Sequence, residues 1–224
     1  MTGSDSTFEI TPATTVRRVP ARASYDRATA WSILDDGLVA HVGFVSDGRP
    51  VVIPMVYGRD GDRLILHASV AGRLARTLSD GVDVCATVTH VDALVMAKSH
   101  FHHSMNYRSV VIMGTATRLT DPDDLVRALE VLVDHVVPGR STESRPPNRT
   151  ELRQTAVLAL PIEHASVKVR TGGPVDDESD LGAPVWSGVV PLVTTPAEPR
   201  PDDTSGDLPL PGSLSPWTRP GAGG

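Results

Sequence analysis

Polar side chains that suit an anionic ligand lie at the ends of several apolar segments. The segment HASVAGR, residues 67–73, brings His67 and Ser69 close to Arg73. A second segment, HSMNYRSVVIMG, changes from polar to apolar within a dozen residues, and its polar part contains Asn106, Tyr107, Arg108 and Ser109. Free backbone N–H groups at a helix start and the fork of an arginine both complement a doubly charged phosphate. The pattern predicts a site for a phosphorylated ligand, and the alternative for each residue taken singly is a solvated strand end.

A third basic segment, VKVR, closes the region of strands. Ser166, Lys168 and Arg170 alternate there with Ala165, Val167 and Val169. Because successive side chains of a strand point to opposite faces, one face of this strand is predicted to be basic and the other packed.

Other catalytic and metal-binding patterns are missing from the sequence. It contains no glycine-rich dinucleotide loop, no Walker sequence, no G-x-S-x-G elbow and no H-E-x-x-H. The segment HFHHS, with His100, His102 and His103, has no second Cys or His pair at a spacing that would complete a tetrahedral site, so no metal is expected. Cys85 is the only cysteine, which excludes an internal disulfide, and we expect it to be a small core residue.

Composition indicates one compact domain with tails. The chain has 224 residues, is 40% hydrophobic and carries a formal charge of −6, which argues against general nucleic-acid binding. No apolar run approaches the roughly 20 residues of a membrane span, and no signal peptide is visible, so we expect a cytoplasmic protein. Pro, Gly and Asp concentrate at the ends, which predicts disordered tails over 1–14 and 194–224 around a domain over 15–193. The apolar island 184–192 is expected to dock on the core or on a second subunit.

The elements that must position these residues are mainly strands. Residues 24–37 are predicted to form a helix with Ser24 as N-cap and Gly37 as stop. Strands over 38–46, 50–58 and 62–69 follow, and the pairs Asp47–Gly48 and Asp60–Gly61 predict tight hairpin turns between them. A short helix is expected over 70–81.

The second half of the chain continues this pattern. Two long strands over 82–97 and 107–119 are predicted to pair through the link 98–106, and Asp121 caps a helix with Pro122 in its first turn. A short helix near Thr150 leads into the apolar stretch 156–172. Six or so antiparallel strands with peripheral helices predict a mainly β fold with some α, a small closed or split barrel.

Several of these segments also resemble a known family. The order of 25–69, HSMNYRSVVIMGTATRL, 151–177 and PVWSGVVPL is similar to the flavin-nucleotide-binding branch of the pyridoxamine 5'-phosphate oxidase-like proteins, the branch that includes nitroimidazole-resistance proteins. The resemblance covers residues 15–193, with HSMNYRSVV and SVKVRTG as its most specific motifs. It implies an FMN-binding split barrel, usually a homodimer with flavin in clefts at the subunit interface, and it does not imply pyridoxamine phosphate as substrate.

The resemblance implies roles for particular residues. The flavin ring of the family lies along the strand that here reads VVIPMVY, so Ile53, Pro54 and Met55 are the candidates for backbone hydrogen bonds to the ring edge. A Ser-Arg-Lys pattern at a helix start usually holds the phosphate; Arg73 matches it, Gly72 replaces the serine and Leu74 replaces the lysine. These departures predict a weaker phosphate site, for which His67, Ser69 and Arg108 are candidates to compensate.

The polar start of HSMNYRSVVIMG then has an explanation. We expect Asn106, Tyr107, Arg108 and Ser109 to line the cofactor cleft or the dimer seam, together with Lys168 and Arg170, while 110–113 enter the barrel. The alternative is that Tyr107 and Arg108 only seal the interface. His67 is the candidate proton donor near the ring.

Two functional classes follow from the resemblance. The first is a flavin-dependent reductase or oxidase of a small molecule, and the second is a non-catalytic binder or scavenger of flavin or haem, since His or Met could ligate iron. FMN is the expected cofactor, with FAD, haem and a deazaflavin as open alternatives.

Overall fold

The computed structural model describes residues 6–77 and 81–214, and its contacts divide the chain into two compact units. Unit 1 consists of 1–37, 87–111 and 164–194, and unit 2 of 38–86, 112–163 and 195–224. The chain passes between the units inside two long strands, β5 (Val82–Met96) and β6 (Ser104–Arg118). The domain boundaries expected after residues 14 and 193 stay predictions.

The strands form an antiparallel sheet that closes on itself. Its order is β1-β8-β6-β7-β4-β3-β2-β5-β9, and an additional pairing of β6 with β5 closes the six central strands into a ring. These strands are β2 (Val39–Ser46), β3 (Arg49–Asp60), β4 (Arg63–Ser69), β5, β6 and β7 (Thr155–Pro161). The mainly β split-barrel fold expected from the sequence is confirmed, including the pairing of the two long strands.

Two tight turns fix the register of the β2–β3–β4 meander. Asp47 and Gly48 both have positive φ, 51° and 72°, so this turn is the mirror-image type whose twist matches the strands. At the second turn Asp60 ends β3 opposite Arg63, and the turn pair is Gly61 and Asp62, with only Gly61 at positive φ, 59°. The expected pair Asp60–Gly61 was therefore wrong by one residue.

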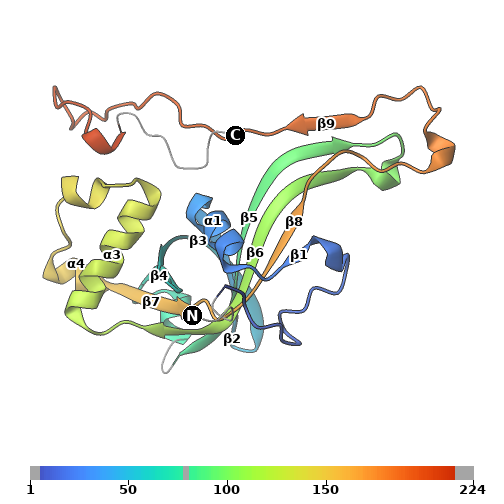
Figure 1. The fold of residues 1–224 in the computed structure, drawn as a ribbon. Coiled ribbons are helices and arrows are strands. Elements are labelled where there is room, and N and C mark those ends of the chain that lie inside the picture. Colours follow the sequence, from blue (N-terminus) through green and yellow to red (C-terminus); the bar gives the residue numbers. More distant parts are fainter. Residues whose placement is uncertain (1–5, 78–80, 215–224) are drawn as a thin grey trace. The chain divides into compact units, whose positions relative to one another are not determined.

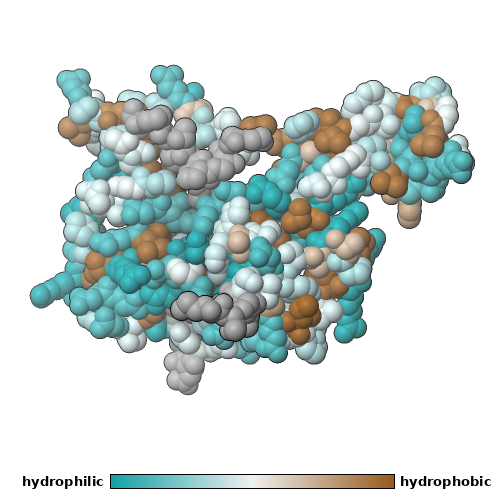
Figure 2. Space-filling model, viewed as in Figure 1, coloured by the Kyte–Doolittle hydropathy of each residue, from teal (hydrophilic) through white to brown (hydrophobic). Residues whose placement is uncertain are grey.

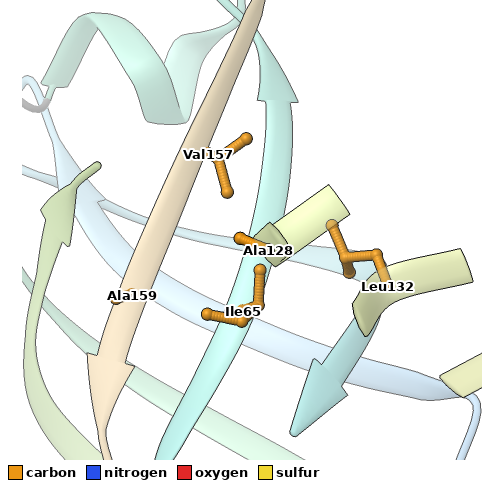
Figure 3. Close-up of a cluster of buried hydrophobic side chains, with 5 residues drawn as sticks. All are labelled: Ile65, Ala128, Leu132, Val157 and Ala159. Carbon is orange, nitrogen blue, oxygen red and sulfur yellow. The ribbon is translucent and has the colours of Figure 1, made fainter. Parts of the chain in front are cut away.

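A buried cluster joins helix α3 (Pro122–Val136) to the ring in unit 2. Ile65 on β4 and Val157 and Ala159 on β7 pack against Ala128 and Leu132 of the helix (Figure 3). Asp121 caps this helix by accepting bonds from the backbone N–H groups of residues 123 and 124, as expected. Helices α2 (Arg73–Thr77) and α4 (Arg149–Gln154) and two short 3-10 helices, η3 (Arg140–Glu143) and η5 (Gly212–Leu214), complete the described elements of unit 2.

Unit 1 is built on the outer parts of β5 and β6. Strand β8 (His164–Arg170) lies beside β6, the two-residue strand β1 (Ala23–Ser24) forms one edge, and β9 (Gly188–Pro191) pairs with β5 at the other (Figure 1). The apolar island thus joins the sheet as β9. Helix α1 (Arg27–Asp36) and three short 3-10 helices, η1 (Pro20–Arg22), η2 (His100–His102) and η4 (Glu178–Asp180), complete the described elements of this unit.

The predicted start of helix α1 was wrong in detail. The N-cap of α1 is Asp26, not Ser24, because the Asp26 carboxylate accepts a 2.7 Å bond from the Thr29 backbone N–H. The hydroxyl of Ser24 instead accepts a bond from the backbone N–H of Asp26. The apolar stretch 156–172 contains two strands, β7 of unit 2 and β8 of unit 1, separated at Ile162 and Glu163.

Candidate functional site

One backbone edge of β3 is free in unit 2. Residues 49–56 pair with β2, with Pro54 opposite His41, whereas β4 pairs only with Tyr57–Asp60. Among the strands that the structure describes, none pairs with the other edge of residues 49–56. The two-residue turn makes Ser46 and Arg49 a hydrogen-bonded pair, and such pairs alternate along an antiparallel ladder, so the backbone groups of Ile53 and Met55 face β2. The backbone groups of Val52, Pro54 and Val56 face the other edge and are available to a ligand there. This is the segment in which the resemblance places the flavin ring edge.

The turn after β4 explains why the usual phosphate pattern is absent. The backbone N–H of Gly72 donates to the carbonyl oxygen of Ser69 at 2.7 Å, and a Cβ atom at position 72 would lie 2.9 Å from that same oxygen. A serine at this position would therefore force the turn apart. Leu74 is 2% exposed and packs inward, so a lysine there would not reach solvent. Arg73, which is exposed, is left as the cation of this segment, and the exposed ring of His67 lies on β4 before it.

Arg108 is held by two carboxylates of unit 1. Its guanidinium donates to Asp92 at 3.1 Å and to Asp36 at 2.9 Å. The hydrogen bonds that Arg108 donates to Asp92 and Asp36 raise its pKa against the opposing effect of its partial burial. The charge of Arg108 is therefore balanced within the chain, and this ion-pair role was not among the sequence predictions. Asp36 and Asp92 lie 72 and 16 residues from Arg108, and no local pattern links them to it.

Asn106 and Arg170 form a buried polar cluster in unit 1. They are 9% and 7% exposed, and the Arg170 guanidinium donates to the Asn106 side-chain oxygen. Arg170 also donates to the carbonyl oxygens of Gly172 and Gly173, the latter at 3.0 Å, and Asn106 donates to Gly172 at 3.1 Å. Arg170 lies on the predicted basic face of β8 but is buried there, because the turn after β8 folds its carbonyl groups over the guanidinium.

Ser109 and Lys168 connect β6 to β8. The Ser109 hydroxyl donates to the Lys168 carbonyl oxygen at 3.3 Å, and the Lys168 ammonium donates to the carbonyl oxygen of Arg18 at 3.0 Å. Tyr107, two residues before Ser109, is half-buried. The structure thus joins Asn106 to Arg170 and Ser109 to Lys168, whereas Ile53, Pro54, Met55, His67, Ser69 and Arg73 belong to unit 2.

An apolar cavity of about 460 Å³ opens on the ring of unit 2. The hairpin β2–β3 forms one wall with Gly43, Val45 and Val52, and Cys85 and Met113 form another. Cys85 is partly exposed there, so its expected place in the core was wrong. A cavity of this size and lining suits an organic ligand. Figure 2 shows that apolar residues also gather in several small surface groups, and Val45 and Val52 are 60% and 63% exposed.

The histidine rings differ in which partners their nitrogen atoms contact. Nδ1 of His103 lies 2.7 Å from the carbonyl oxygen of Ser99, so Nδ1 carries the proton and Nε2 is an acceptor. His102 lies 3.2 Å from Asp177, and His135 packs on Tyr57. Within 6–77 and 81–214, no group of three or more His, Cys, Asp or Glu side chains is placed to hold a metal ion, and no helix there is long and apolar enough to cross a membrane.

Comparisons with known proteins agree with this architecture. The family model described as pyridoxamine 5'-phosphate oxidase matches residues 26–169. The chain belongs to this family. The flavocytochrome Anf3 of Azotobacter vinelandii is 39% identical, with a TM-score of 0.86 over 92% of this chain and 96% of its own. An FAD- and heme-binding protein of Mycobacterium smegmatis is 37% identical, with a TM-score of 0.81 over 87% and 96%.

A more distant structure shares the fold alone. A putative 5-nitroimidazole antibiotic resistance protein of Bacteroides thetaiotaomicron is 24% identical, with a TM-score of 0.55 over 66% of this chain and 86% of its own. No curated protein sequence matches the chain. The predicted resemblance to the pyridoxamine 5'-phosphate oxidase-like proteins is confirmed.

Proposed function

We propose that this chain is a flavin-dependent oxidoreductase of a small molecule that binds FAD, with haem as a second group. The observation that carries the proposal is the 37–39% identity, over at least 87% of this chain, to one protein described as a flavocytochrome and one described as FAD- and heme-binding. FMN, which the family resemblance implies, is the competing flavin.

The residues of unit 2 fit a flavin ring. The unpaired backbone edge at residues 49–56 supplies N–H and C=O groups for the polar edge of the ring, and the apolar cavity accepts a ring of low polarity. Arg73 is available to a phosphate group. When bound, the flavin supplies the electron transfer; the chain's own part is to bind and orient it, and His67 is the side chain proposed to hold or release a proton.

His103 fits a haem ligand best among the described histidines. Its Nδ1–H donates to a backbone carbonyl, which fixes the ring and leaves Nε2 for iron, the arrangement that metal-binding histidines commonly show. His103 is also exposed, so a bound group can approach it. In His90 the Nε2 atom already lies 3.0 Å from the Ile33 carbonyl oxygen.

A homodimer is part of the proposal, as the resemblance implies. The exposed valines of unit 2, Val45 and Val52 beside the cavity and Val39 and Val56 along the same strands, form an apolar surface that a second copy would cover. Light scattering of the purified protein measures this mass directly.

The first experiment is an absorbance spectrum of the purified protein, followed by titration of the apoprotein with FAD, FMN and haem. Flavin bands, with tighter binding of FAD than of FMN, support the proposal, and an intense violet band supports haem. His103→Ala is expected to remove haem binding and leave flavin binding intact, whereas the control His164→Ala, an exposed histidine on β8, leaves both intact. A protein that binds neither flavin overturns the assignment.

A turnover experiment then distinguishes an oxidoreductase from a non-catalytic flavin binder or scavenger. An oxidoreductase holds its flavin through repeated reduction by dithionite and reoxidation by a small quinone or nitroaromatic acceptor. A binder or scavenger releases the flavin or fails to pass electrons to any acceptor, which would favour the non-catalytic alternative.

A further inference from the structure

Four cationic residues gather at one edge of the sheet in unit 1. We call Arg17, Arg18, Arg22 and Lys168 the basic cluster. Edge strand β1 pairs Ala23 with Lys168, so Arg22 immediately precedes the strand partner of Lys168. The Lys168 ammonium also donates to the carbonyl oxygen of Arg18 at 3.0 Å. Residues far apart in the sequence are thereby brought together at the start of β1.

The basic cluster has no carboxylate partner in the part of the chain that the structure describes. Three arginines elsewhere are held by carboxylates: Arg63 by Asp60 and Asp124, Arg108 by Asp36 and Asp92, and Arg145 by Glu151. The acidic residue closest in sequence to the cluster, Asp26, accepts bonds from the Thr29 backbone and hydroxyl. Unneutralised cations are therefore concentrated at one place in a chain whose formal charge is −6.

The backbone between the arginines is held in a costly conformation. Val19 has φ 52° and ψ 63°, in the left-handed region that β-branched residues rarely occupy. It precedes Pro20, and its carbonyl oxygen accepts a 3.0 Å bond from the Arg22 backbone N–H. Only Val19 and the first two residues of the 3-10 helix η1 lie between Arg18 and Arg22. The Arg18 carbonyl oxygen, just before this turn, accepts the hydrogen bond from the Lys168 ammonium. Strained residues of this kind persist where surrounding contacts fix them, commonly at binding sites.

We propose that the basic cluster binds the pyrophosphate group of a dinucleotide. Two linked phosphates present several anionic oxygens close together, and arginine forks bind such oxygens with paired hydrogen bonds. The single phosphate of FMN would leave part of the cluster unmatched. FAD and the nicotinamide dinucleotides carry the same pyrophosphate chemistry, and the titrations below distinguish them.

The test uses ADP, which contains the pyrophosphate without any flavin. Isothermal titration at low ionic strength compares the wild type with the triple variant Arg17→Gln, Arg18→Gln, Arg22→Gln. The matched control is Arg118→Gln, Arg149→Gln, Arg200→Gln, which removes the same charge from exposed positions of unit 2. Lys168→Gln, tested separately, removes the fourth charge of the cluster together with the ammonium bond to the Arg18 carbonyl oxygen. We expect ADP affinity to fall about tenfold or more in the triple variant, to fall less in Lys168→Gln and to stay unchanged in the control.

Parallel titrations identify the source of the pyrophosphate. If FAD is the ligand, the triple variant weakens FAD binding and leaves FMN binding unchanged; if NADH or NADPH is the ligand, its binding falls instead. Unchanged ADP affinity in the triple variant, or no ADP binding by the wild type, overturns the inference. A protein that binds ADP through the cluster but binds no flavin overturns the proposed function and not the cluster.

Discussion

The arginine network around Asp60 in unit 2 and the basic cluster in unit 1 differ in how their charges are balanced. In unit 2 the guanidinium of Arg63 is shared by Asp60 and Asp124, and Arg127 adds a second cation to Asp60. In unit 1 the basic cluster has no carboxylate partner among the described residues, and buried Arg170 donates only to carbonyl oxygens and an amide. The ion pairs of Arg63 and Arg127 connect β3 and β4 to helix α3. The cations of the basic cluster are not neutralised by a described carboxylate, so their charge is available to an anionic ligand. The comparison separates structural arginines from candidate binding arginines without reference to sequence motifs.

The largest effect is expected from removing the shared carboxylate. Asp60→Ala deletes the acceptor of two hydrogen bonds from Arg63 and one from Arg127, at a side chain that is 13% exposed. Hydrogen bonds to charged groups are worth roughly 1.5–3 kcal/mol, so the free energy of unfolding should fall by about that amount. Urea denaturation measures it, with Glu198→Ala, an exposed carboxylate, as the control. Equal stability of the two variants would contradict the structural role of this network.

The stabilisation that Asp60 provides is expected to depend on pH. Burial opposes ionisation of Asp60, but bonds from Arg63 and Arg127 outweigh it, and the pKa lies below its ordinary value of 3.8. Because the folded-state pKa is lower than the unfolded one, the stabilisation is present above pH 3.8 and is lost as pH falls through the folded-state value. The stability difference between the wild type and Asp60→Ala should therefore be constant near neutral pH and shrink in acid. A difference that grows on acidification would reverse the assigned sign.

A smaller effect is expected at the turn of the basic cluster. Val19→Asn relieves the left-handed strain, since asparagine tolerates this conformation, and should raise the free energy of unfolding by about 1 kcal/mol. Val19→Ala keeps most of the steric conflict and serves as the comparison. A loss of stability in Val19→Asn would mean that contacts of the valine side chain, and not its backbone, matter at this position.

The smallest change in stability is expected from the basic cluster, and it tests the contrast with the Arg63 network. Removing the three arginine charges of the basic cluster by glutamine should change the free energy of unfolding by less than about 0.5 kcal/mol, because no carboxylate partner is lost. Thermal unfolding of the apoprotein measures this. A marked loss of stability would show that these arginines hold the fold, as Arg63 does.

Local chemistry in the sequence determined much of the architecture. Asp47–Gly48 fixed a hairpin through its positive φ angles, Asp121 and Pro122 began α3, and alternating apolar residues marked the strands, so the split barrel was predictable. These signals act within a few residues of chain and do not depend on distant partners. The segment containing Ile53, Pro54 and Met55 was identified through the family resemblance, and its roles stay predictions.

The partners of the charged side chains were decided only by the tertiary structure. Arg108 meets Asp36 across 72 positions, Lys168 meets the Arg18 carbonyl across 150, and Arg170 is buried by the turn that follows its own strand. Each of these depends on which strands become neighbours in the sheet. Even the replacement of serine by Gly72 became explicable only when the Ser69 carbonyl oxygen was found where a side chain would stand. The sequence alone determined where cations occur, and the fold decided which of them are neutralised, because ion pairing depends on distances that strand pairing sets.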